Sequence, residues 1–197
     1  MMKHNTRIEK LISSGKNVFS INDIAVIWEI TDRRKLIEII KHYIRNKRLF
    51  SAHKGIYTYD EKYDTYDLAQ KLVPLSYISL YTALQNHGIC FQHYSSIFCV
   101  AMKSRIYEIN NQTYIYKQIK GSILFNSVGL INNGKYTIAD KERTICDSIY
   151  FFPGIYFDNL RNIDTEKLKN ISNIYSNLRV EKEVKKLMDI INNERKS

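Results

Sequence analysis

The sequence predicts an α+β protein, with a winged helix-turn-helix domain over residues 1–60 and an α+β domain over residues 61–197 that has a mixed or antiparallel sheet and C-terminal helices. Three observations predict this class. Apolar residues recur at helical spacing in three segments before residue 47. A short hairpin pattern follows. After Asp60 the pattern changes, and alternating strand segments precede further helical ones. The order helix, helix, longer helix and hairpin is that of a winged helix-turn-helix.

The first two helices are short. One is expected from Thr6 to Ser14, with Gly15 as its C-terminal cap. The next begins after Ser20, because Asp23 stands three residues further on, in a pattern like a capping box. The apolar residues that define the two helices are Ile8, Leu11 and Ile12 in the first and Ile24, Ala25 and Trp28 in the second.

The third helix is longer and basic. It is expected over residues 32–46, with Thr31 or Asp32 as its N-terminal cap. One stripe along it packs inward and another faces outward. The inward stripe is Leu36, Ile40, Tyr43, Ile44 and Lys47, and the outward stripe is Arg34, Glu38, Lys41 and Arg45.

The stretch RLFSAHKGIYTYD, residues 48–60, predicts a hairpin. Leu49 and Ser51 alternate on one strand, and Ile56 and Thr58 on the other. The turn between them is His53-Lys54-Gly55, in which glycine supplies a positive φ. In a winged helix-turn-helix this hairpin is the wing, and its basic tip reaches a phosphate or the minor groove beside the recognition helix.

Positive charge is concentrated on these two elements. The chain has 30 Lys and Arg against 20 Asp and Glu, a net charge of +10. Residues 33–54 hold eight basic side chains and one acidic one, a net charge of +7. Charge of this kind on a recognition helix and wing predicts binding to double-stranded DNA. The expected DNA-binding residues are Arg33, Arg34, Lys35, Lys41, Arg45, Lys47, Arg48, His53 and Lys54.

Two alternatives stay open at this point. The basic surface of a small packing module can be merely solvated, as most charged segments are. A winged helix can also bind protein or RNA. Single-stranded RNA is the less favoured partner, because Tyr43 and Phe50 follow apolar stripes and are not interleaved with the basic residues for base stacking.

The second domain begins near Asp60-Glu61-Lys62. Helices are expected at residues 64–72, ending before Pro74, and from Ser76 through Leu84, with a stop at Gly88. Strands are expected at residues 96–102, 106–109, 113–119, 123–131 and 135–138, the last two joined across Asn132-Asn133-Gly134. Asp140 caps a helix over residues 141–151, and two helices at about 165–176 and 180–192 close the chain.

No pattern for catalysis or metal binding is apparent, so we expect no enzyme activity, cofactor or metal. His87, Cys90, His93 and Cys99 are zinc-type ligands, but their spacing fits no common zinc finger. A nuclease needs clustered carboxylates with a lysine to hold a divalent cation, a pattern that Glu108, Asp140, Lys141 and Glu142 only loosely imitate. A nucleotidyltransferase needs two carboxylates soon after a Gly-Ser turn, and Gly121-Ser122 is followed by none before residue 140. No Gly-rich phosphate loop is present.

The expected location is the cytoplasm. Three scattered cysteines indicate a reducing compartment. The opening MMKHNTRIEKLISSGKN lacks the apolar core of a signal peptide, and no later run approaches about 18 apolar residues, so we expect no membrane contact.

Three motifs resemble the AbiEi family, antitoxins of bacterial abortive-infection and type IV toxin-antitoxin systems. They are PLSYISLYTALQNHGI at residues 74–89, YTIADKERTICDSIYF at residues 136–151, and the wing sequence Lys54-Gly55-Ile56-Tyr57. The resemblance implies a bacterial autorepressor that binds inverted repeats at its own promoter. It also implies that the C-terminal domain counteracts a nucleotidyltransferase-type toxin, functionally if not by direct contact. A stand-alone regulator or interaction module without a toxin is the alternative.

The residues of these C-terminal motifs are expected to be structural. Five of them are expected to lie in the hydrophobic core: Tyr77, Ile78, Tyr81, Leu84 and Ile89. Glu142 lies in the first turn of its helix, where a carboxylate favours the helix dipole, and Asp147 follows five residues later. Both carboxylates are predicted to stabilise the fold.

Overall fold

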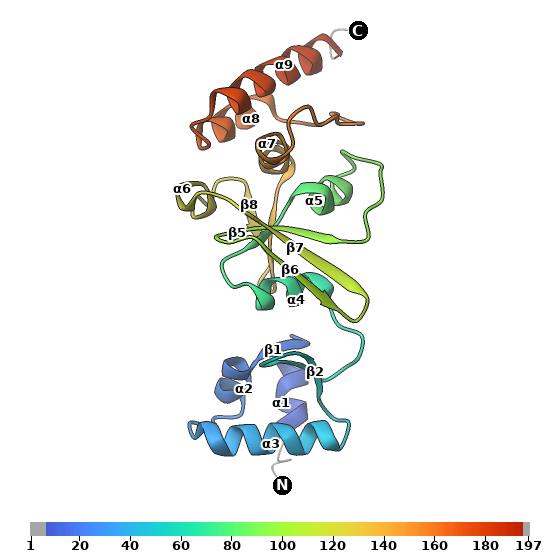
Figure 1. The fold of residues 1–197 in the computed structure, drawn as a ribbon, viewed down its shortest axis with the longest axis vertical. Coiled ribbons are helices and arrows are strands. Elements are labelled where there is room, and N and C mark those ends of the chain that lie inside the picture. Colours follow the sequence, from blue (N-terminus) through green and yellow to red (C-terminus); the bar gives the residue numbers. More distant parts are fainter. Residues whose placement is uncertain (1–6, 195–197) are drawn as a thin grey trace. The chain divides into compact units, whose positions relative to one another are not determined.

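The computed structural model describes residues 7–194 and confirms the α+β class (Figure 1). The chain divides into two compact units, Met1–Pro74 and Leu75–Ser197. The division falls later than the expected boundary after Asp60. The reason is that helix α4 (Thr65–Leu72) packs on the first unit, where Lys71 Nζ lies 2.8 Å from Asp23 Oδ2.

Three helices and a hairpin open the first unit, as expected, but a strand lies between the first two helices. The elements before α4 are α1 (Arg7–Ser13), β1 (Val18–Ser20), α2 (Ile21–Ile27), α3 (Arg33–Arg45), β2 (Phe50–His53) and β3 (Ile56–Thr58). The strands form an antiparallel sheet in the order β1-β3-β2. Thr6, the expected first helical residue, lies outside the described residues.

Local sequence sets the helix boundaries in this unit. Ser20 and Asp23 form the predicted capping box: Ser20 Oγ accepts a hydrogen bond from Asp23 N at 3.1 Å, and Asp23 Oδ2 accepts one from Ser20 N at 2.7 Å. Asp32, rather than Thr31, caps α3. The core of the unit contains a ring of apolar side chains around Trp28, whose Nε1 donates to the carbonyl of Arg7 at 2.9 Å.

The second unit is built on one mixed sheet of six strands in the order β6-β7-β5-β4-β9-β8. The β5/β7 and β4/β9 pairs are parallel and the other pairs are antiparallel. The strands are β4 (Tyr77–Ile78), β5 (Ile97–Ala101), β6 (Arg105–Ile109), β7 (Gln112–Gln118), β8 (Leu130–Asn132) and β9 (Thr137–Ala139). The helices are α5 (Leu80–Asn86), α6 (Gly121–Leu124), α7 (Lys141–Phe151), α8 (Thr165–Asn173) and α9 (Leu178–Glu194).

Two expectations for the second unit were wrong. The helix expected from Ser76 begins only at Leu80, because Tyr77 and Ile78 form β4 between strands β5 and β9. The strand expected over residues 123–131 is a short helix, α6, and a loop before β8. In that loop Gly129 has φ +78°, and a Cβ there would lie 2.7 Å from Arg143 Cβ, so only glycine allows this close approach.

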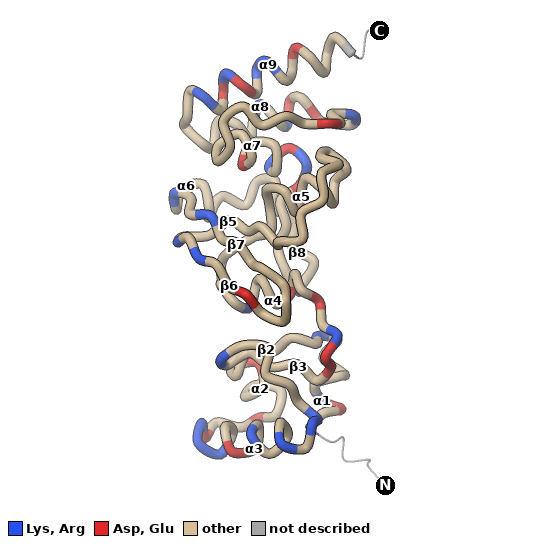
Figure 2. The backbone as a smooth tube through the Cα atoms, turned by 45° about the vertical axis from the view of Figure 1, so that its right-hand side comes forward, with Lys and Arg blue, Asp and Glu red and all other residues tan. Residues whose placement is uncertain are grey.

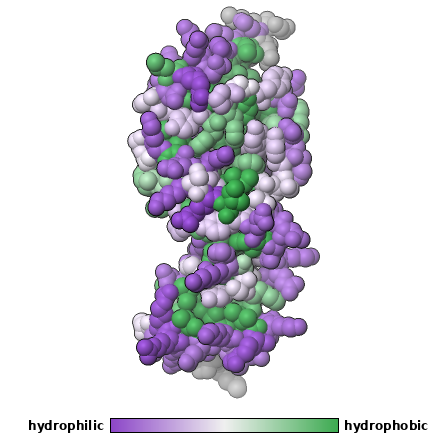
Figure 3. Space-filling view, in the orientation of Figure 1, coloured by the Kyte–Doolittle hydropathy of each residue, from purple (hydrophilic) through white to green (hydrophobic). Residues whose placement is uncertain are grey.

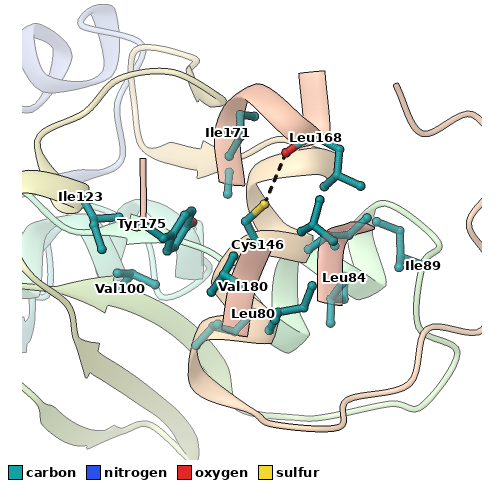
Figure 4. Close-up of a cluster of buried hydrophobic side chains, with 14 of the residues drawn as sticks. Leu80, Leu84, Ile89, Val100, Ile123, Cys146, Leu168, Ile171, Tyr175 and Val180 are labelled. Atoms are coloured by element: carbon teal, nitrogen blue, oxygen red, sulfur yellow. Dashed lines mark hydrogen bonds between the residues drawn. The ribbon is translucent and has the colours of Figure 1, made fainter. Parts of the chain in front are cut away.

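Helix α7 is the centre of the second unit. In Figure 1 it lies between the sheet and helices α8 and α9, and it packs against α5, α8 and α9. The residues from Glu142 to Ile149 are all buried, which is typical of a helix covered on every side. Figure 4 shows the surrounding core, in which Cys146 Sγ donates to the carbonyl of Leu168 at 3.9 Å.

Candidate nucleic-acid interface

Helix α3 presents a basic face to solvent. Its apolar side is fixed by Leu36 and Ile40, which are buried against the core of the first unit. The four residues of the predicted outward stripe are all exposed: Arg34, Glu38, Lys41 and Arg45. Because residues three and four apart share a helix face, these side chains form one continuous surface.

The first turn of α3 carries three consecutive exposed cations, Arg33, Arg34 and Lys35, and no acid. Asp32 is used in capping, since its Oδ1 accepts from the backbone N of Arg34 at 2.8 Å and of Lys35 at 3.2 Å. Cations at this end of a helix oppose its dipole, an effect of up to about 1 kcal/mol each at exposed sites. A bound anion removes that conflict.

Further cations lie just beyond the end of the helix. Lys47 is exposed with φ +53°, in the turn that leads to β2, so it is not part of the inward stripe on which it was expected. Arg48 is exposed, and its backbone N donates to the carbonyl of Tyr43 at 2.9 Å. The turn therefore holds both side chains at the end of the basic face.

The hairpin tip has the predicted form. Gly55 has φ +78°, Lys54 beside it is exposed, and His53 is half-buried. The carbonyl of Gly55 accepts from Ile21 N at 3.0 Å, which holds the tip against the start of α2. In Figures 1 and 2, α3 lies on one side of α1 and α2, and the strands lie on the other.

The expected cations are not neutralised within the protein. Among the described residues of the first unit, the ion pairs join Lys10 to Glu29 and Lys71 to Asp23. The eight Lys and Arg residues of the predicted interface have no carboxylate partner in the described part of the chain. Figure 2 shows Lys and Arg positions along α3 and at the hairpin tip, and Figure 3 shows hydrophilic residues along the margin formed by α3. The cations of α3 and of the turn after it can bind a polyanion by replacing its counterions, while the hairpin lies on the other side of α1 and α2.

In the second unit the polar residues serve the fold. Asp147, fully buried, accepts hydrogen bonds from the hydroxyls of Ser79 at 2.7 Å, Tyr175 at 2.6 Å and Tyr77 at 3.1 Å. Burial raises the pKa of Asp147, although the nearby Arg143 and the three hydroxyl donors act in the opposite direction.

Arg143 is the buried counter-charge of Asp147. Its Nε lies 3.7 Å from Asp147 Oδ1, and its two terminal nitrogens donate to the carbonyls of Ile123 at 2.7 Å and Val128 at 3.1 Å. Burial lowers the pKa of Arg143, but Tyr175, Asp147 and Tyr77 outweigh this effect and raise it overall, so the guanidinium stays charged. These bonds hold the loop before β8 against α7.

Glu142 also has structural contacts. Its Oε1 accepts from Asp164 N, the cap of α8, at 3.0 Å, and its Oε2 lies 3.2 Å from Lys167 Nζ. Lys167 also lies 2.7 Å from Asp140, which caps α7. The starts of α7 and α8 are joined by these contacts. The sequence identified Glu142 and Asp147 but missed Arg143, whose signal was its place four residues before Asp147 on the same face of the helix.

Two hollows adjoin the segment between α7 and α8. One, of about 790 Å³, lies beside α9 and is lined by polar and apolar residues alike, among them Ile155, Leu187 and Arg161. The other, of about 380 Å³, is lined by Tyr81, Phe91 and Tyr94 among others. Tyr156 lines both and is 78% exposed. Apolar side chains in this position can bind another protein segment.

The zinc-type residues considered above have other contacts. The ring of His87 lies 2.8 Å from the carbonyl oxygen of Ala139, and that of His93 lies 3.2 Å from Gln85 Nε2. Burial raises the pKa of the Cys99 thiol, which lies in strand β5. Over residues 7–194, no three His, Cys, Asp or Glu side chains gather in a way that could hold a metal ion. None of the described helices combines the length and apolar character needed to cross a membrane.

No protein-family model matches this chain, and no curated protein matches it. A function for this chain is therefore inferred from its own residues.

Proposed function

We propose that the protein is a DNA-binding transcriptional repressor, not an enzyme, and that its first unit is a winged helix-turn-helix. The order of elements α1, β1, α2, α3, β2 and β3 supports this, since α2 and α3 then correspond to the helix-turn-helix and β2 and β3 to the wing. The observation that carries the proposal is the set of eight unpaired, exposed cations on α3, the turn after it and the hairpin tip.

In this proposal the two ends of α3 differ in their role. The N-terminal residues of a recognition helix reach base edges in the major groove, and its C-terminal turns leave the groove toward the phosphates. Arg33, Arg34 and Lys35 therefore read bases. Lys41, Arg45, Lys47, Arg48 and Lys54 neutralise phosphates, which fixes register and supplies most of the affinity. His53, half-buried, supports the tip of the wing.

We further propose that the protein is a bacterial, cytoplasmic member of the AbiEi family. It represses its own promoter by binding inverted repeats there, and its second unit counteracts a nucleotidyltransferase-type toxin. The resemblance of residues 74–89, 136–151 and the wing sequence supports this part. The buried contacts of Glu142 and Asp147 are consistent with a second unit that acts by its surface and not by catalysis.

A reporter experiment tests the proposal. The region upstream of the gene is fused to a reporter, and the protein is supplied from an unrelated promoter. Wild-type protein should lower reporter output, and Arg34→Ala should relieve that repression. Both should neutralise the product of a neighbouring toxin gene equally, because the second unit is unchanged. Repression that is unaffected by Arg34→Ala and Lys41→Ala together would contradict DNA binding through α3.

A protein-binding module is the second candidate. The two hollows around the exposed Tyr156 support it, because a surface that combines apolar and polar side chains with an exposed tyrosine fits a protein segment. Affinity purification of wild type and Tyr156→Ala distinguishes the two functions. Loss of a partner with Tyr156→Ala, while a DNA duplex fails to compete for that partner, supports the module. Retention of all partners contradicts it.

A further inference from the structure

One acidic residue lies within the basic face of α3. Glu38 is the single carboxylate among residues 33–54, and it is exposed on the outward stripe with Arg34, Lys41 and Arg45. Its basic neighbours on the helix surface are Arg34 and Lys35, four and three residues before it, and Lys41 and His42, three and four residues after it. No carboxylate–cation contact within 4.0 Å joins Glu38 to any of them in the described chain.

A carboxylate in this place is unfavourable for phosphate binding, because it repels the DNA backbone and offsets one of the surrounding cations. It also does not serve α3 as an intrahelical ion pair, since those contacts are not made. The position of Glu38 on α3 suggests a different partner. Glu38 follows Arg34 by one turn, on the side of the helix that the proposed docking directs into the major groove.

Base edges in the major groove offer one good partner to a carboxylate. Cytosine presents only its N4 amino donor there, whereas adenine places the acceptor N7 beside its N6 donor, and guanine presents two acceptors. A carboxylate therefore favours cytosine and is repelled by purine acceptors. Arginine has the opposite preference, since it pairs with the O6 and N7 acceptors of guanine.

We propose that Glu38 is a specificity-determining residue that accepts a hydrogen bond from the N4 amino group of a cytosine. The inference rests on the proposed DNA binding and names part of its target. A helix rises about 1.5 Å per residue, so Glu38 lies about 6 Å along α3 from Arg34. DNA rises about 3.4 Å per base pair. The preferred duplex therefore has a C·G pair about one or two base pairs from the guanine contacted by Arg34.

Selection from a pool of randomised DNA duplexes tests this, using the full-length chain as wild type, Glu38→Gln and Glu38→Ala. Wild type should enrich a motif in which one position is cytosine, with substitution of that base weakening binding roughly ten- to hundredfold. Glu38→Gln should change the preference at that position alone toward adenine, because an amide pairs with adenine N6 and N7. Glu38→Ala should lose the preference. Both variants should bind random DNA more tightly than wild type.

The matched control is Glu61→Gln, which removes the same charge from an exposed site of the first unit outside α3. It should leave the motif unchanged. If Glu38→Gln enriches the wild-type motif and only binds all duplexes more tightly, the inference is wrong and the proposed function stands. If wild type enriches no motif although it binds duplexes, base reading by α3 is wrong. If wild type binds no duplex at low salt, the proposed function itself fails.

Discussion

Arg34 and Lys41 lie on the same outward face of α3, about two turns apart, and both are exposed and unpaired. Their expected effects on DNA binding differ. Arg34→Ala should cost about 1–3 kcal/mol on the operator and much less on random DNA, because it removes a base contact. Lys41→Ala should weaken both duplexes about equally, because it removes a phosphate contact. Titrations of each variant with the two duplexes measure this, and equal losses everywhere would contradict the division of roles.

A second prediction at the level of single residues concerns stability and the buried pair Arg143 and Asp147. Asp147→Leu and Arg143→Met should each lower the free energy of unfolding by about 3–5 kcal/mol, because each leaves the partner charge buried and uncompensated. The double variant Arg143→Met with Asp147→Leu should lose less than the sum of the single losses. Urea unfolding of the four proteins measures the coupling. Losses below about 1 kcal/mol for both single variants would show that the pair does not hold the loop before β8.

At the scale of elements, the hairpin β2–β3 is short, and its tip is held at the start of α2. Its contribution to binding should therefore be small but measurable. Replacing His53 and Lys54 with alanine should weaken operator binding and reduce the slope of log affinity against log salt by about 0.9, the value of one phosphate contact. Circular dichroism should show an unchanged fold. If the affinity of this variant depends on salt in the same way as that of wild type, the hairpin only covers the core and does not contact DNA.

Helix α4 is attached to the first unit through Lys71 and Asp23, which gives a prediction for pH. Burial acts to raise the pKa of Asp23, but hydrogen bonds from Lys71 and Ser20 outweigh it, and the pKa is lowered overall. An acid with a lowered folded-state pKa stabilises the fold above its unfolded pKa of about 4, and this stability is lost as pH falls through the folded value. Asp23→Asn should thus be less stable than wild type at pH 7, and thermal melting should show the difference shrinking as pH falls below about 4, because the folded-state carboxylate is then progressively protonated. A difference that does not shrink as pH falls would exclude the ionised carboxylate as its cause.

The elements that the sequence predicted are those whose signals are local. Caps at Ser20, Asp32 and Asp140 mark helix starts, and Asn132-Asn133-Gly134 marks the β8–β9 turn. The missed strands β1 and β4 are two or three residues long and pair with strands at least 19 residues away in the sequence. No periodicity is visible over such a length. The wrong strand at residues 123–131 has a similar cause, because the bonds that shape this loop come from Arg143.

At the scale of the whole molecule, positive charge is concentrated in residues 33–54 of the first unit, whereas the buried charged residues of the second unit, such as Arg143 and Asp147, are used in folding. The sequence placed most of the excess charge in residues 33–54, and the structure leaves those cations exposed and unpaired within the described chain. Sequence pattern could not reveal the hollows beside Tyr156, because they form between segments that meet only in the fold. We therefore propose that the first unit binds DNA and that the second unit has a separate role.

The most direct test is the affinity of the full-length protein for a duplex of its upstream region, measured between about 50 and 200 mM salt. Five cations lie outside the first turn of α3 and are assigned to phosphates. They predict a slope of about −4 to −5 in log affinity against log salt for each copy bound, and a loss of roughly 250- to 1,000-fold across this range. The account is contradicted if the protein does not bind at 50 mM salt, or if it binds with a slope near zero.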